Sequence, residues 1–316
     1  MNFKLSIITP AYNEARNLPV LHDRIRAVLD AMEVEWEWIV VDDHSRDHSF
    51  QVVGAIAREN PRVKALRLSR NFGSHAAISC GVHHADGDCC VVLAGDLQDP
   101  PEVIPSLIKE WQDGSHIVWA ARAAREGETR STLMFAIAYY WLMRRVIGME
   151  NVPAGGADFF LLDRRVMDAY SRFGERNVSI LALLSWMGFR QRFVEYDKQA
   201  RLHGASGWTL GKKVKLAMDS VTSFSYLPVR MMSVVGVATA LLGFMYALFV
   251  FVNALRGNSV EGWSSIMLVV LMLGGIQMIM LGVLGEYLWR TLEESKQRPT
   301  YLVEERIGVG NDKPDD

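Results

Sequence analysis

The chain has 316 residues, of which 50% are hydrophobic and 22% are charged, and its formal net charge is −2. This length allows one large domain and a further segment, and the apolar share excludes a disordered chain. A net charge near zero provides no basic field that would attract a polyanion, so nucleic-acid binding is not expected.

Residues 1–120 alternate between short apolar runs and segments with helical spacing. The runs predict five strands, at Lys4–Thr9, Trp36–Val41, Val63–Leu68, Cys89–Leu93 and Ile117–Ala120. The segments between them predict helices over 18–32, Ser49–Glu59, Ser74–Ala85 and Glu102–Trp111. Such alternation predicts an α/β fold with a doubly wound, mostly parallel sheet, which binds ligands at the carboxyl ends of its strands.

Polar and acidic residues follow four of the predicted strands, at Pro10–Glu14, Asp42–Ser45, Ser69–Gly73 and Gly95–Pro101. One carboxylate at such a rim can accept hydrogen bonds from a base or ribose, and another can hold a divalent cation on a diphosphate. For Asp43 and Asp99 a plainer interpretation stays open, because each precedes a helix and would serve as its N-cap. The sequence contains neither the G-x-G-x-x-G dinucleotide motif nor a P-loop.

Two stretches near the C-terminus, Met231–Val252 and Ser264–Gly285, hold 22 residues each and no charged side chain. At about 1.5 Å of rise per residue, each helix is long enough to cross a hydrocarbon core. Two buried helices of a soluble core are the alternative, but two such runs so close together favour a transmembrane hairpin. Lysines and arginines gather outside the pair, so the positive-inside bias places both outer ends in the cytoplasm.

The expected layout is a cytoplasmic domain over 1–208, an amphipathic helix over 209–229, two spans within 230–290 (about 231–252 and 264–287), and a cytoplasmic tail over 291–316. Within 209–229, apolar residues recur at helical spacing with lysines on the other side, a pattern that suits a membrane interface. A helix packed on the globular domain would show the same pattern. A multi-pass protein with its larger domain in the cytoplasm is therefore expected.

Several strings resemble a known family: ITPAYNEARNL, VVDDHSRDHS, LSRNFGSHAA and LAGDLQDPPEVIP. They are similar to the motifs of family 2 glycosyltransferases with the GT-A fold. Within that family, the resemblance is to the polyprenyl-phosphate glycosyltransferases, the group of dolichol-phosphate mannose synthases and bactoprenol glucosyltransferases. The strings GADFFLLDRRV, SWMGFRQRFVEY and GGIQMIMLGVLGEYLWRTLEESKQRPTYLV extend the resemblance through the acceptor region to the second span.

The resemblance implies a set of site residues. Around the base, ribose and phosphates of a nucleotide sugar it implies Pro10, Tyr12, Glu14, Asp42, Asp43 and Arg122. It implies Mg²⁺ or Mn²⁺ as a cofactor, with Asp96 as the main metal carboxylate and Gln98 as a further metal contact. At the acceptor phosphate it implies Arg130, Arg201 and Ser206, and it places Asp158 beside the sugar as a second catalytic residue with Asp96. An ordinary surface charge is the alternative for each of the three arginines.

The chain departs from the family pattern at three positions. Ala94 stands where the metal-binding D-x-D element has its first aspartate, so Asp96 is the only carboxylate of that element. Histidines replace the two glycines of the V-D-D-G-S-x-D-G-S motif, at His44 and His48. His44 is therefore expected to adopt the left-handed turn geometry, which histidine tolerates better than most residues.

The function that the resemblance implies is inverting transfer of a sugar, foremost glucose from UDP-glucose, to undecaprenyl phosphate. The reaction would take place at the bacterial inner membrane, in cell-envelope or lipopolysaccharide synthesis. Another nucleotide sugar, such as an aminoarabinose derivative or mannose, is the nearest alternative. A membrane protein that only binds nucleotide sugar or lipid is a second alternative, supported by Ala94 alone, and a homo-oligomer stays open.

Overall fold

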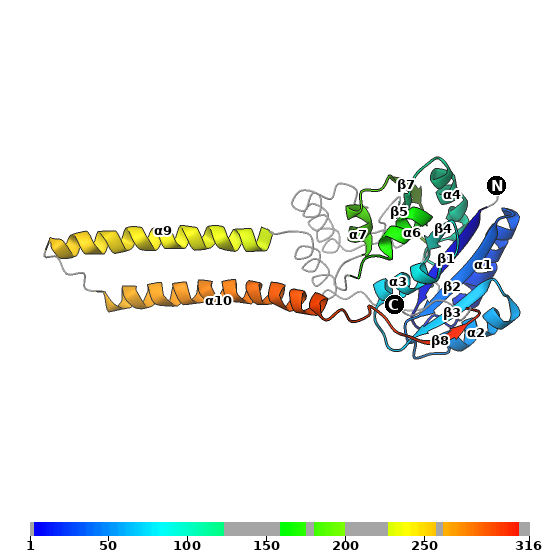
Figure 1. Ribbon diagram of the computed structural model, residues 1–316, viewed down its shortest axis with the longest axis horizontal. Helices are drawn as coiled ribbons and strands as arrows, with labels where there is room; N and C mark the ends of the chain where they lie inside the picture. The colour runs from blue at the N-terminus through cyan, green and yellow to red at the C-terminus, as the bar shows by residue number, and fades with distance from the viewer. Residues whose placement is uncertain (1–2, 123–158, 175–179, 200–226, 257–261, 310–316) are drawn as a thin grey trace. The chain divides into compact units, whose positions relative to one another are not determined.

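An eight-stranded mixed sheet forms the centre of the larger of two compact units (Figure 1). The computed structural model of the chain describes residues 3–122, 159–174, 180–199, 227–256 and 262–309. The larger unit comprises residues 1–217 and 299–316, and the smaller one comprises residues 218–298.

Five strands of the sheet confirm the sequence-based prediction, namely β1 (Lys4–Ala11), β2 (Glu35–Asp42), β3 (Val63–Leu68), β4 (Cys89–Val92) and β5 (Ile117–Arg122). Three further strands were not predicted: β6 (Phe160–Asp163), β7 (Gln191–Tyr196) and β8 (Val303–Ile307). The order across the sheet is β7-β5-β6-β4-β1-β2-β3-β8. Only β6 and β8 run antiparallel to the strands beside them, so the sheet is mostly parallel, as expected.

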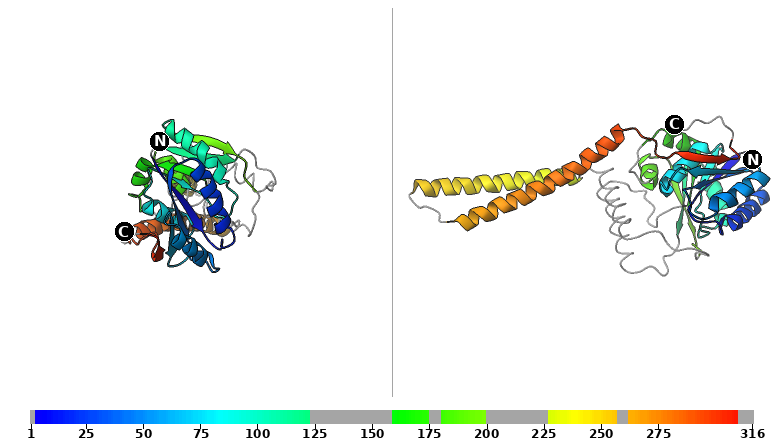
Figure 2. Two further views of the ribbon diagram at one scale, coloured as in Figure 1. Left: turned by 90° about the vertical axis from the view of Figure 1, so that its right-hand side faces the viewer. Right: turned by 90° about the horizontal axis from the view of Figure 1, so that it is seen from below.

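Helices cover both faces of this sheet, as a doubly wound fold requires (Figure 2). One face packs against α1 (Leu18–Ala31), α2 (Ser49–Glu59) and α4 (Ile104–Gln112), which follows a short 3₁₀ turn at Pro101–Val103. The other face packs against α3 (Ser74–His84), α6 (Arg164–Tyr170) and α7 (Ile180–Trp186). Successive strand residues point to opposite faces, and the central strands are therefore apolar almost throughout.

The strand β8 completes the sheet beside β3, although it comes from the predicted C-terminal tail. The amide of Ser69 donates a hydrogen bond to the carbonyl of Leu302 (2.9 Å), which extends this pairing. The side chain of Ile307 covers Gly54 of α2 so closely that an added Cβ would lie 2.8 Å from its Cδ1 atom. Part of the tail is thus an integral part of the larger unit.

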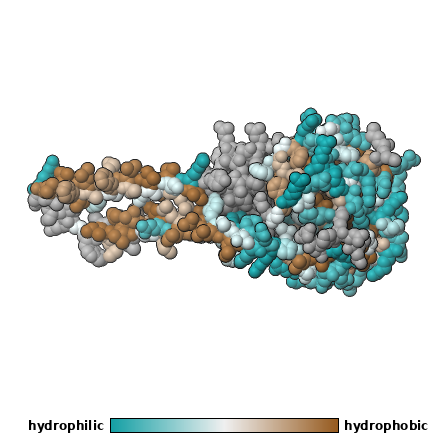
Figure 3. Space-filling model, in the orientation of Figure 1, coloured by the Kyte–Doolittle hydropathy of each residue, from teal (hydrophilic) through white to brown (hydrophobic). Residues whose placement is uncertain are grey.

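The smaller unit contains two long helices, α9 (Leu227–Leu255) and α10 (Trp263–Ser295). Both extend beyond the two predicted spans, and within them Val229–Asn253 and Met272–Ser295 have the length and composition of membrane-crossing helices. Apolar side chains cover them (Figure 3), and Phe244 and Met278 are each 70% exposed. The helices approach each other where Gly236 faces Met280. Of the predicted amphipathic helix, residues 209–226 lie outside the described residues, and residues 227–229 belong to α9.

Candidate functional site

The carboxyl ends of six strands meet at one edge of the sheet. The strands β1 to β4 are parallel, and β5 and β7 point the same way because the antiparallel β6 separates them from β4. Between β1 and β4 the order of the strands reverses, which is where open α/β sheets bind ligands. The predicted residues in the described part of the chain all lie at this edge: Pro10, Tyr12, Glu14, Asp42, Asp43, Asp96, Gln98 and Arg122.

The loop after β1 lies between the loops that follow β2 and β4. Asn13, with φ of 61°, donates its amide hydrogen to Ser45 Oγ (2.9 Å), and Glu14 donates its amide hydrogen to Ser49 Oγ (2.8 Å). A Cβ added to Gly95 would lie 3.4 Å from Glu14 Cγ, so the loop after β4 passes close by on the other side. Tyr12 is 40% exposed, which leaves its ring accessible to a ligand.

Asp42 and Asp43 are both buried, and each orders a loop. Asp42 accepts a hydrogen bond from the Ser45 amide (3.2 Å), and burial raises its pKa in spite of this bond. Asp43 accepts from the amides of Phe72 (2.7 Å) and Gly73 (2.9 Å), just ahead of α3. Burial raises the pKa of Asp43 to about 6, although both amides act in the opposite direction.

The plainer interpretation of Asp43 as the N-cap of its own helix is wrong. Asp43 bonds to the loop before α3, whereas α2 begins only at Ser49, whose amide donates to Asp47 Oδ1 (3.0 Å). His44 has φ of 57°, which confirms the expected left-handed geometry. Its Nδ1 atom donates a hydrogen bond to the Leu68 carbonyl (3.0 Å), which stabilises the unusual conformation.

The loop after β4 carries the predicted metal residues. Asp96 is 8% exposed and accepts a hydrogen bond from the Gln98 amide (3.2 Å), while Leu97 between them has φ of 61°. Asp99 is buried and accepts a hydrogen bond from the Tyr196 hydroxyl. Its carboxylate also lies 3.4 Å from Lys198 Nζ. The N-cap position of the following 3₁₀ turn is Pro100, so Asp99 is not its N-cap, and Asp99 links the loop to the end of β7.

A divalent cation fits the chemistry of this loop. Asp96 and Gln98 offer a carboxylate and an amide oxygen, which are ligands that Mg²⁺ prefers. Within residues 3–122, 159–174, 180–199, 227–256 and 262–309, no three histidine, cysteine, aspartate or glutamate side chains come together as a complete metal site. Because Mg²⁺ keeps several waters and binds substrate phosphates, two protein ligands are sufficient for it.

The remaining predicted residues divide into one that the structure describes and four that it does not. Arg122 is the last residue of β5, and in the register of the sheet it lies opposite Tyr196 of β7, the strand that holds Asp99. The other four, Asp158, Arg130, Arg201 and Ser206, lie outside the described residues. Sequence reasoning missed Tyr196, Lys198 and also Gln199, whose amide donates to the Gln98 carbonyl (2.8 Å). Nothing in the local sequence around these three residues points to the distant loop that they contact.

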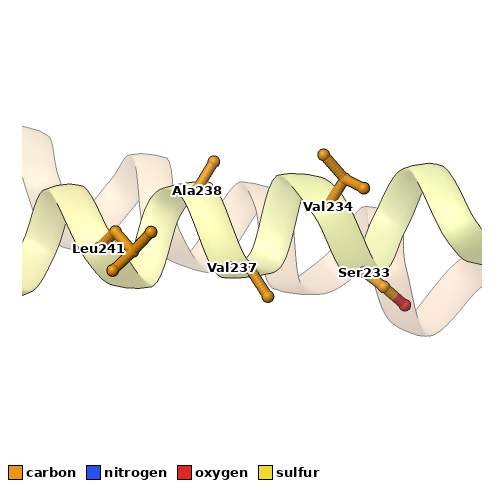
Figure 4. A pocket seen from close by; sticks show the side chains of 5 residues that line it. All are labelled: Ser233, Val234, Val237, Ala238 and Leu241. Atoms are coloured by element: carbon orange, nitrogen blue, oxygen red, sulfur yellow. The ribbon is translucent and has the colours of Figure 1, made fainter.

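A shallow hollow occurs on α9 in the smaller unit, and it contains none of the predicted site residues (Figure 4). Its lining is apolar except for one serine and consists of Ser233, Val234, Val237, Ala238 and Leu241. It has no group that could bind a phosphate or transfer a proton. The chemistry of the described residues is therefore concentrated at the strand ends of the larger unit.

Comparison with known proteins gives two family matches. The model of the family "Glycosyl transferase family 2" matches residues 6–171, and that of the "GtrB C-terminal hairpin" matches residues 227–290. The chain is 36% identical over 311 residues to the uncharacterized glycosyltransferase YkcC of Bacillus subtilis, which covers 98% of this chain and 96% of that protein. It is 36% identical over 301 residues to the bactoprenol glucosyl transferase of Shigella phage SfV, with 95% and 98% covered.

A solved structure resembles this chain in fold. A crystal structure of a mycobacterial protein superposes with a TM-score of 0.50 at 17% identity, over 70% of this chain and 73% of that one. At this identity the likeness concerns the fold alone.

Proposed function

This chain belongs to glycosyl transferase family 2, and from that premise we propose that it is a membrane-anchored, inverting enzyme that glycosylates a polyprenyl phosphate. We propose undecaprenyl phosphate as the acceptor and UDP-glucose as the donor. The observation that carries this proposal is the similarity to a bactoprenol glucosyl transferase, which extends over 95% of the chain and includes both units. The proposed location is the bacterial inner membrane, with the larger unit in the cytoplasm.

The residues at the strand ends support a proposed role for each part of the donor. Tyr12, whose ring is accessible, would contact the base, and Glu14 and the buried pair Asp42 and Asp43 would accept hydrogen bonds from the ribose or base. Asp96 and Gln98 would hold a divalent cation, which when bound neutralises charge on the leaving diphosphate. Arg122 at the end of β5 would add a positive charge near the same phosphates.

The acceptor side requires little acid–base chemistry. A phosphate monoester has a second pKa of about 6, so at neutral pH its oxygen is already an ionised nucleophile. This oxygen attacks the anomeric carbon from the side opposite the nucleotide, and the bond to the diphosphate breaks, which inverts the configuration. Arg201, Ser206 and Arg130 are proposed to hold the acceptor phosphate. Asp158 would orient the sugar or a basic partner and would not act as a general base.

The test of this function is transfer of label into lipid. Membranes that contain the protein are incubated with labelled UDP-glucose and undecaprenyl phosphate, and the lipid is then extracted. We expect labelled lipid, and none from membranes without the protein. Labelling from GDP-mannose or an aminoarabinose nucleotide, but not from UDP-glucose, would identify a different donor for the same type of reaction. If none of these nucleotide sugars labels the lipid, a protein that only binds its ligands is the better description.

The proposed topology predicts the accessibility of introduced cysteines. A cysteine at Ser259, between α9 and α10, is expected to react with an impermeant thiol reagent added from the periplasmic side. Native Cys80 is no suitable control, because Cys80, Cys89 and Cys90 are all fully buried. A cysteine at the exposed Ser171 of the larger unit takes its place and is expected to react only after the membrane is permeabilised. The opposite labelling pattern would rule out a cytoplasmic larger unit.

A further inference from the structure

The pairing of β8 with β3 contains an irregularity at Glu304. Arg67 of β3 lies opposite Glu305, and the next residue, Leu68, lies opposite Val303. Glu304 is therefore an extra residue in β8 without a partner in the register, which is a β-bulge. Bulges redirect a side chain and are common next to functional sites.

The redirected carboxylate of Glu304 lies between two groups that contact the site. It is 3.5 Å from Arg67 Nε and 3.6 Å from His44 Nδ1. Arg67 Nε lies in turn 3.8 Å from Oδ2 of the fully buried Asp42. The guanidinium of Arg67 is also held over the ring of Phe50, 5.5 Å from its centre. Glu304 and Asp42 thus both lie beside Arg67, which the ring of Phe50 keeps in place.

His44 connects the same carboxylate to the turn that follows β2. This residue has the left-handed conformation and donates its Nδ1 hydrogen to the Leu68 carbonyl. Asp42 and Asp43 directly precede it, and Asp43 orders the amides ahead of α3. A carboxylate that fixes both Arg67 and His44 therefore fixes the shape of the 42–44 turn from both sides.

We propose that Glu304 is a positioning residue for donor binding, which acts through Arg67 and His44 on the turn that carries Asp42 and Asp43. This inference rests on the proposed function, because it takes the 42–44 turn to bind the nucleotide end of the donor. Glu304 touches no substrate itself. The strand that follows the second apolar helix in the chain thus contributes to the affinity for the nucleotide.

The experiment compares Glu304→Gln with Glu305→Gln in the purified full-length protein. Glu305 is the neighbouring exposed residue of the same strand, and it takes no part in the contacts of Glu304 with Arg67 and His44. We measure the Kd for UDP and for GDP separately, the KM for the donor and for the acceptor, kcat, and the Tm.

Glu304→Gln is expected to raise the Kd for UDP and the donor KM about fivefold, since the ion pair with Arg67 and the contact with His44 are weakened together. The acceptor KM, kcat and Tm should change little, and Glu305→Gln should match the wild type. If Glu304→Gln does not fold, His44→Asn offers the same test, because asparagine tolerates the left-handed conformation and its shorter, uncharged side chain loses the imidazole contact with Glu304. It should raise the same two constants.

The outcomes separate the inference from the proposed function. If the wild type binds UDP and Glu304→Gln binds it as tightly, the positioning role is refuted and the proposed function is unaffected. If kcat, both KM values and Tm all worsen together, Glu304 has a merely structural role and the inference is again refuted. If the wild type binds neither UDP nor GDP and labels no lipid, the proposed function itself has failed.

Discussion

Replacing Asp96 by asparagine is expected to lower the turnover by about 10³-fold, because one oriented group that stabilises developing charge is commonly worth about 3–4 kcal/mol. With Ala94 two residues earlier, no second carboxylate of this element can substitute for Asp96. The substitution keeps the size of the side chain and its bond from the Gln98 amide, so the fold should persist. The measurement is the rate of sugar transfer to lipid by equal amounts of purified protein.

Removal of metal provides an independent test of the same site. EDTA should abolish the activity of the wild type, and Mg²⁺ or Mn²⁺ should restore it. The matched control is Asp113→Asn, at an exposed position after α4, which should behave as the wild type. Full activity in EDTA would contradict the metal role of Asp96 and would assign the stabilisation of the diphosphate to Arg122 and its neighbours.

Glu37→Gln is expected to destabilise the larger unit by about 3 kcal/mol, because it breaks a buried ion pair by removing one charge. Glu37 lies at the opposite end of the sheet from the candidate site and is almost fully buried. Its carboxylate contacts Lys64 Nζ (2.7 Å), Ser6 Oγ (2.6 Å) and the Asp86 amide (2.8 Å). In a domain of this size the loss corresponds to a Tm lowered by about 10 °C.

The same carboxylate predicts a dependence of stability on pH. Burial by itself raises the pKa of Glu37, but the bonds from Lys64, Ser6 and Asp86 together lower it below the usual 4.5. The stability that this group contributes is therefore complete above about pH 4.5 and is lost as the pH falls through the lowered pKa. Glu37→Gln should reduce this loss on acidification, whereas Glu35→Gln, an exposed control on the same strand, should not. An unchanged Tm in Glu37→Gln would contradict this account.

The elements predicted correctly are those whose residues carry their own pattern. The strands β1 to β5 are apolar runs and α1 to α4 have a helical spacing, so no knowledge of distant partners was needed. The strand β8 reads V-E-E-R-I, and its charged residues conceal the β-structure that arises from pairing with β3. Two strands so far apart in the chain pair only because the whole fold brings them together, and their local sequences carry no sign of that pairing.

The candidate site was predictable to the same extent. Because β1, β2 and β4 are parallel, the residues that follow them necessarily meet, and Glu14, Asp43 and Asp96 could be placed at one edge from the sequence. The residues that support this edge could not be identified from the sequence. Asp99 was weighed as a helix cap, yet it bonds to Tyr196 of a strand that was not predicted. Tertiary contacts override local capping preference in this case.

The position of β8 in the chain also sets an order of events during synthesis. This strand follows α10, so it leaves the ribosome only after both apolar helices have emerged. Until then β3 is an edge strand with unpaired N–H and C=O groups, and Arg67 lacks one of its two carboxylates. The nascent chain therefore acquires its membrane-type helices before the 42–44 turn has all of its supporting contacts.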